Sequence, residues 1–204
     1  MSKTKKTLSL VLSFVLVIAL TIAGTVAYLT SKTSTVTNTF TVGKVAITLD
    51  EADTNTYGEP LDASGNVVDD VDDAKRDTAN EYKLVPGHAY TKDPTVHFLA
   101  DSEKSYLFVK VVDGLAAIED DTTVAAQIAA NGWDALEGVD NVYYKVVDAA
   151  TEDTDYVVFE TFKLKSDADV TSYASATIEI TAYAIQFDGL ASASAAWTAG
   201  GFGA

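Results

Sequence analysis

Hydrophobic and polar residues alternate with a period of two along most of the chain, which is the spacing of β-strands rather than helices. In the stretch ATIEITAYAIQF, the even positions from Ile178 to Ala184 are apolar, whereas Thr177, Glu179 and Thr181 are polar. This pattern predicts a half-buried antiparallel strand. Turn residues separate further segments of this kind, which predict strands at 82–85, 88–99, 105–113, 142–147 and 156–165. The sequence therefore predicts an all-β antiparallel sandwich.

The alternation changes phase at Gly43. Before it, the even positions Val36, Phe40 and Val42 are apolar, and after it the apolar positions are odd, beginning with Val45. A shift of one residue moves every side chain to the opposite face of a strand. We therefore expect a bulge or a sharp bend at Gly43.

Two short segments follow a helical pattern instead. In DDTTVAAQIAANGW, Asp121 is a candidate N-cap, Val124 and Ile128 share one face, and Asn131-Gly132 is a typical helix end. A second short helical turn is predicted over ASASAAW. Residues 51–80 directly follow the first predicted strand region and are rich in Asp, Asn, Gly and Thr. Their composition predicts an acidic insertion with a small hairpin at LDASGNVV.

The N-terminus has the layout of a secretory signal. Lys3, Lys5 and Lys6 precede an almost uninterrupted apolar run over 8–23, and Ala27 offers a small residue for cleavage before Tyr28. We expect cleavage between these two residues. An uncleaved N-terminal anchor is the alternative, because the run is only slightly shorter than the roughly 18–20 residues of a membrane span.

Charge and cysteine content exclude several classes of function. The formal net charge is −16, and removal of residues 1–27, which contain three basic and no acidic residues, leaves −19. Such a charge repels phosphate backbones, so we expect no nucleic-acid partner. The chain has no cysteine, which excludes disulfides, thiolate metal sites and a cysteine nucleophile.

The stretch GTVAYLTSKTSTVTNTFTVGKVAITLDE, residues 24–51, resembles the signal-to-mature junction of the TasA and camelysin (CalY) proteins, exported bacterial proteins processed by a SipW-type signal peptidase. The stretches YKLVPGHAYTKDPTVHFLADSEKSYLFVKVV and ITAYAIQFDGLASASAAW resemble the family's middle strands and its closing strand and helical turn. The resemblance implies a jelly-roll sandwich over residues 38–204. Residues 51–80 and 114–155 match no quoted family feature.

For function, the resemblance implies a secreted subunit or accessory protein of an extracellular biofilm-matrix or surface fibre. The implied partners are further copies of the chain, related matrix subunits and the dedicated signal peptidase. Family members complete a neighbour's sheet with their freed N-terminal segment, here residues 28–37. The residues expected to form this donor strand are Tyr28, Leu29, Thr30, Thr33, Thr35 and Val36. Strand addition of this kind relies on main-chain hydrogen bonds.

Enzymatic chemistry finds little support in the sequence. The zinc-protease pattern H-E-x-x-H is absent, as are the G-x-S-x-G elbow and a glycine-rich phosphate loop. The only histidines, His88 and His97, would need Asp93 or Asp101 nearby to form a metal site. We expect no catalytic residues, no metal and no cofactor, with a camelysin-type metallopeptidase and a membrane-anchored binding module as the alternative functions.

The acidic run DDVDDAKRD at 69–77 raises the question of calcium. It supplies four carboxylates, Asp69, Asp70, Asp72 and Asp73, but lacks the spacing of an EF-hand loop. We therefore interpret the run as a solvated acidic loop.

Overall fold

The computed structural model describes residues 43–203, and these form an antiparallel all-β fold with two short α-helices. The signal segment, the cleavage site at Ala27 and Tyr28, and the donor segment 28–37 lie outside the described residues, as does the alternation before Gly43. Among residues 43–203, no helix is long and apolar enough to cross a membrane.

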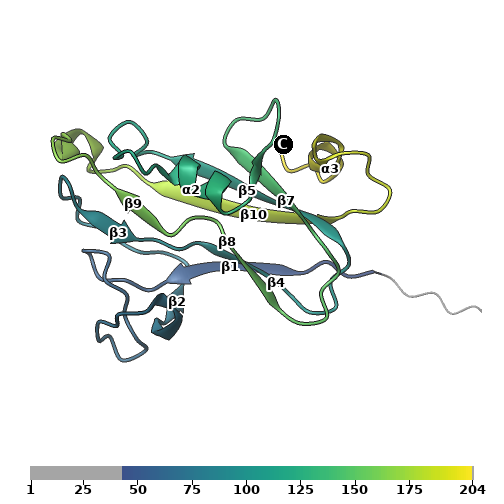
Figure 1. Cartoon of the computed structure of the whole chain (residues 1–204), viewed down its shortest axis with the longest axis horizontal. Coiled ribbons are helices and arrows are strands. Elements are labelled where there is room, and N and C mark those ends of the chain that lie inside the picture. Colours follow the sequence, from purple (N-terminus) through teal and green to yellow (C-terminus); the bar gives the residue numbers. More distant parts are fainter. Residues whose placement is uncertain (1–42, 204) are drawn as a thin grey trace, which may run out of the picture. The chain divides into compact units, whose positions relative to one another are not determined.

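The described strands form two four-stranded sheets and one small two-stranded sheet, and every pairing between these strands is antiparallel. The first sheet has the order β2 (Arg76–Asp77), β1 (Ile47–Ala52), β4 (Thr95–Phe98) and β8 (Thr154–Val157). The second has the order β10 (Ile178–Gln186), β5 (Ser105–Asp113), β7 (Val142–Val147) and β6 (Asp134–Ala135). The small sheet pairs β3 (Ala89–Thr91) with β9 (Thr161–Lys163). Figure 1 shows the first sheet below the second.

The main core lies between the two larger sheets. It includes Val96 and Phe98 of β4 and Leu107 and Val109 of β5, all of them at most 1% exposed. Alternate residues of β5 point the other way, and there Phe108 packs in a second cluster with Trp197 of α3 (Ala193–Ala199). Residues 105–109 of β5 are buried on both faces, which agrees with their nearly continuous apolar sequence, whereas Lys110 and Val112 are exposed.

The predicted strands at 105–113 and 142–147 are confirmed as β5 and β7, and the alternation at 178–186 is confirmed as β10. Two longer predictions were only partly correct. The segment 88–99 is divided into β3 and β4, and 156–165 into β8 and β9. Both breaks occur where the chain leaves one sheet for another, and Pro94, which has no N–H to donate to a ladder, lies at the first break.

The predicted strand at 82–85 was wrong. Its backbone joins no ladder, because the Lys83 N–H donates to the carbonyl of Thr56 (2.8 Å) and the Val85 N–H donates to the hydroxyl of Tyr90 (2.7 Å). The alternation was nevertheless informative, since Tyr82 and Leu84 pack against the main core.

The first predicted helix forms as α2 (Val124–Ala130), with Val124 and Ile128 buried on one face as expected. Its N-cap is Thr123 rather than Asp121, because the Thr123 hydroxyl accepts the N–H of Ala126. The second helix, α3, begins after the Ser192 cap. Two 3-10 turns, η1 (Val71–Asp73) and η2 (Val170–Tyr173), complete the helical elements of the described residues.

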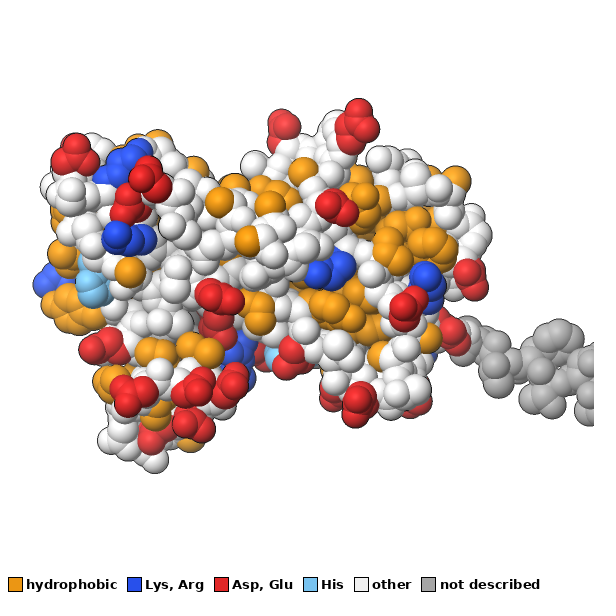
Figure 2. All heavy atoms as spheres, viewed as in Figure 1, with side chains coloured by type: hydrophobic (Ala, Val, Ile, Leu, Met, Phe, Trp, Pro, Cys, Tyr) orange, Lys and Arg blue, Asp and Glu red, His pale blue; other side chains and the backbone are white. Residues whose placement is uncertain are grey.

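The acidic segment 51–80 begins inside β1, which ends at Ala52. Leu61 and Val67 form an antiparallel bridge around the Asp62–Asn66 turn, as the predicted hairpin requires. Figure 2 shows acidic side chains gathered over the part of the surface that carries β2 and η1.

Candidate strand-docking groove

Two of the unpaired strand edges in the described structure lie next to each other. β10 ends its sheet and pairs only with β5, and β1 pairs with β4 on one side while only its last two residues pair with β2 on the other. Although they belong to different sheets, β1 and β10 lie side by side. An unpaired edge exposes a row of N–H and C=O groups that can bind another strand.

The ladder hydrogen bonds show which backbone groups are unpaired. At the two ends of β10, Gly114 donates to the Thr177 carbonyl and Phe187 donates to the Lys104 carbonyl. Backbone groups alternate between the two sides of an antiparallel strand, so the odd residues of β10 bond to β5 and the even ones point outward. The residues whose backbone N–H and C=O groups point to the open edge are Ile178, Ile180, Ala182, Ala184 and Gln186.

The unpaired backbone groups of β1 follow from its ladder in the same way. The Leu99 N–H donates to the carbonyl of Ala46, which places the even residues of this strand on the β4 side. Ile47 and Leu49 therefore direct their backbone groups toward the unpaired edge, while their side chains pack against the main core.

A groove occupies the space between these edges. Its cavity of about 540 Å³ is lined by residues 49–51 of β1, residues 177–181 at the start of β10, and Asn80, Lys92 and Pro94. An adjoining cavity of about 430 Å³ shares Asn80, Lys92, Thr177 and Ile178 with it. Ile178 and Ile180 of β10 are only partly buried, so the core is open to solvent along this seam.

The opposite seam of the molecule, between β7 and β8, is closed by side chains. Trp133 is 2% exposed and its indole N–H donates to the carbonyl of Val157 (3.0 Å). The ammonium of Lys145 lies over the rings of Trp133 and Tyr156 and donates to the carbonyl of Asn131 (2.8 Å). The groove between β1 and β10 has no such cover within residues 43–203, which makes it the candidate docking site.

A buried ion pair lies at one end of the groove. The ammonium of Lys92 is 2.5 Å from the carboxylate of Glu51, and both side chains are less than 10% exposed. Asn80 donates to the other oxygen of Glu51 (2.8 Å) and to the carbonyl of Ala52 (2.9 Å). This network holds the segment before Tyr82 against β1 and leaves the groove with no unpaired buried charge at that end.

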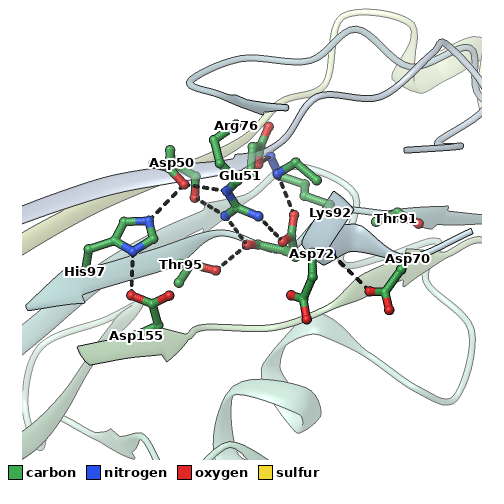
Figure 3. Close-up of polar contacts among 12 residues, drawn as sticks. Asp50, Glu51, Asp70, Asp72, Arg76, Thr91, Lys92, Thr95, His97 and Asp155 are labelled. Carbon is green, nitrogen blue, oxygen red and sulfur yellow. Dashed lines mark hydrogen bonds and ion pairs between the residues drawn. The ribbon is translucent and has the colours of Figure 1, made fainter. Parts of the chain in front are cut away.

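A second polar network braces β1 from the outer face of its sheet (Figure 3). Arg76 of β2 binds the carboxylates of Asp50 (2.7 Å) and Asp93 (2.5 Å). His97 of β4 lies between the carboxylates of Asp50 (3.0 Å) and Asp155 of β8 (2.6 Å). The network therefore joins β2, β1, β4 and β8 and fixes the wall that β1 gives to the groove.

The charges of this network shift one another's protonation. Burial alone would lower the pKa of His97, but its hydrogen bonds to Asp50 and Asp155 outweigh burial and raise the pKa above 6.5. Burial alone would raise the pKa of Asp50, and its hydrogen bonds from His97 and Arg76 lower it instead.

The candidate metal ligands named from the sequence are each hydrogen-bonded or ion-paired to other parts of the protein. His88 binds the carbonyl of Tyr57 through Nε2 (2.8 Å), whereas His97 binds the two aspartates, so the histidines contact different residues. Asp93 pairs with Arg76, and the Asp101 N–H donates to the carbonyl of Ala150 (2.9 Å). In the described part of the chain, no three or more His, Cys, Asp or Glu side chains form a group that could hold a metal ion.

The four aspartates weighed for calcium, Asp69, Asp70, Asp72 and Asp73, are exposed. Asp70 caps η1 by accepting the N–H of Asp72 (3.0 Å). Its position is thus explained by a local turn.

Comparison with known proteins adds no relative: no family model, no curated protein and no solved structure matches the chain.

Proposed function

We propose that this protein is an exported structural subunit or accessory protein of an extracellular fibre, which polymerises by strand exchange. In this proposal, cleavage after Ala27 frees residues 28–37, and this donor segment enters the groove between β1 and β10 of the next copy. The completed fold is a jelly-roll-like sandwich. The assembled fibre would be built from copies of this chain, alone or with related matrix subunits.

The observation that carries the proposal is the groove with its two unpaired edges. Each even residue of β10 directs one N–H and one C=O to the open edge. A hydrogen bond between strands contributes roughly 0.5–1.5 kcal/mol to the free energy of association. β10 is nine residues long, so its free edge is long enough to accept a strand from the donor segment. Several such bonds favour the association of two subunits.

The composition of the donor segment supports the same proposal. Residues 28–37 contain neither Pro nor Gly and are rich in threonine, a β-branched residue that favours strands. No Asp or Glu occurs from Tyr28 to Leu49, although the chain contains thirty acidic residues. An arm with Lys32 and a freed amino terminus is thus attracted to an acidic body.

The test compares three forms of the protein by electron microscopy and size-exclusion chromatography. We expect the mature chain starting at Tyr28 to form filaments, and the uncleaved precursor to remain monomeric. Deletion of residues 28–36 should abolish filaments while the circular dichroism of a folded β protein is retained. Filaments of unchanged yield from the deletion variant would refute donor-strand exchange.

A further inference from the structure

We infer the register of the proposed donor strand: Lys32 of one copy pairs with Glu179 on the β10 edge of the next, in an antiparallel arrangement. This inference rests on the proposed function, because it assigns the contacts of the same docking event.

Successive side chains of β10 point to opposite faces of the sheet. The even residues from Ile178 to Ala184 face the main core, and the odd residues face outward. Along the outward row, Thr177, Glu179 and Thr181 are exposed and polar, and Tyr183 then begins an apolar part that packs on α3. Glu179 accepts a hydrogen bond from the Thr177 hydroxyl (3.2 Å) and has no cationic partner among the described residues.

Lys32 is the only charged side chain in the donor segment, so it decides which face of the donor points outward. Within the groove, Lys92 and Glu51 already neutralise one another. A second ammonium facing the core would lack a carboxylate of its own, which is costly in a buried position. Lys32 therefore belongs to the outward row, where Glu179 is the carboxylate bordering the groove.

This placement aligns both rows of side chains. In an antiparallel strand with Lys32 opposite Glu179, Thr30 lies opposite Thr181 and Tyr28 lies opposite Tyr183. Opposite charges, threonine pairs and aromatic pairs are each favourable across neighbouring strands.

On the inner face, the same alignment puts Leu29 opposite Ala182, the smallest residue type of the inner row. Its side chain thus has room beside the core. The antiparallel direction agrees with every other pairing in this sheet.

The backbone geometry makes the inference measurable. The even residues of β10 direct their backbone N–H and C=O groups to the open edge, so the odd residue Glu179 and Lys32 form a pair without mutual main-chain hydrogen bonds. In such pairs the Cα atoms are about 4.5 Å apart, within the roughly 4.4–6.8 Å that a disulfide spans. The chain has no cysteine, so introduced cysteines report only on the chosen pair.

The first experiment mixes two single-cysteine mature proteins, Lys32→Cys and Glu179→Cys, under mild oxidation and measures disulfide dimers on non-reducing gels. We expect efficient cross-linking of this pair and at least roughly tenfold less when Lys32→Cys is mixed with Thr177→Cys or Thr181→Cys. Thr30→Cys should cross-link with Thr181→Cys, whereas a parallel strand would favour Thr177→Cys. Filaments that form without the 32–179 cross-link would overturn the register while leaving donor-strand exchange intact.

The second experiment tests the charge pair by the rate of filament growth. Glu179→Lys should slow growth about tenfold at ~50 mM salt and less at higher salt, because the effect is electrostatic. Adding Lys32→Glu to Glu179→Lys should restore growth. The matched control is Glu137→Lys, which changes an exposed glutamate on the β6–β7 turn by the same charge.

Equal growth of Glu179→Lys and Glu137→Lys would overturn the pairing. If neither the wild-type mature chain nor any variant forms filaments, the proposed function itself fails. The two failures are therefore distinguishable.

Discussion

Replacement of Glu119 by glutamine should remove a pH dependence that is built into the fold. Glu119 follows β5 and is 3% exposed. Its two carboxylate oxygens accept the N–H of Val124 (3.2 and 3.1 Å), the first residue of α2. Burial and the nearby charge of Asp113 raise the pKa of Glu119 from 4.5 to about 7, against the opposing effect of the Val124 hydrogen bond.

The sign follows from linkage between protonation and folding. Between pH 4.5 and 7 the folded state holds a proton on Glu119 that the unfolded state has released. The free energy of unfolding therefore falls as the pH rises through this range and levels off above about pH 8.

The full shift corresponds to at most about 3 kcal/mol. A cavity of about 260 Å³ lined by Asp113, Glu119 and Tyr143 adjoins the carboxyl group. Because water entering this cavity would screen the charge, we expect a loss of about 1–2 kcal/mol between pH 5 and pH 8.

The assay is urea unfolding at pH 5, 6, 7 and 8, followed by tryptophan fluorescence. The variant lacking residues 28–36 serves as background, so that unfolding is not coupled to assembly. Glu119→Gln keeps an oxygen for the Val124 N–H and should flatten the pH dependence, while Glu137→Gln, at an exposed position, should leave it unchanged. Parallel pH curves for the Glu119→Gln variant and its parent would refute the reasoning.

Three further outcomes are expected in the same background. His97→Gln should remove stability that is present below pH 6.5 and lost as the pH rises through the raised pKa of His97, measured as the difference between the two pH curves. Lys92→Met leaves the Glu51 carboxylate buried and should cost about 3–5 kcal/mol in urea unfolding; restoration of most of that loss by adding Glu51→Gln would support the ion-pair explanation, and no restoration would contradict it. Gly58→Ala should cost about 2 kcal/mol or more, because Gly58 has φ +76° and an added Cβ would lie 2.7 Å from Cα of Tyr90; a thermal midpoint equal to the parent's would contradict this.

Where a strand is long and its apolar residues lie in the core, local sequence was sufficient to place it. The segments 105–113, 142–147 and 178–186 were located from their apolar residues, because the period of a strand is fixed by its backbone geometry. The buried pair Val124 and Ile128 likewise identified α2. Its cap was misplaced by two residues because Asp121, Thr122 and Thr123 are all suitable caps, and packing of the helix on the core selects among them.

Sequence reasoning failed where a segment changes partners. The strands predicted at 88–99 and 156–165 ran through Lys92–Pro94 and Val158–Glu160, yet the chain crosses between sheets at both places. The residues 82–85 alternate like a strand, but their N–H groups bond to Thr56 and to the side chain of Tyr90. Periodicity reports which side chains are buried and carries no information about which backbone lies alongside.

The sequence by itself determined the strand-rich composition, the acidic charge, the absence of cysteine and the apolar faces of the main strands, since each depends on residues that are neighbours in the chain. The groove was decided only by tertiary structure. Leu49 and Ile180 are far apart in sequence, and neither signals that its backbone edge lacks a partner. An unpaired edge is defined by the strand that is missing beside it, so it can be recognised only after all other strands have been placed.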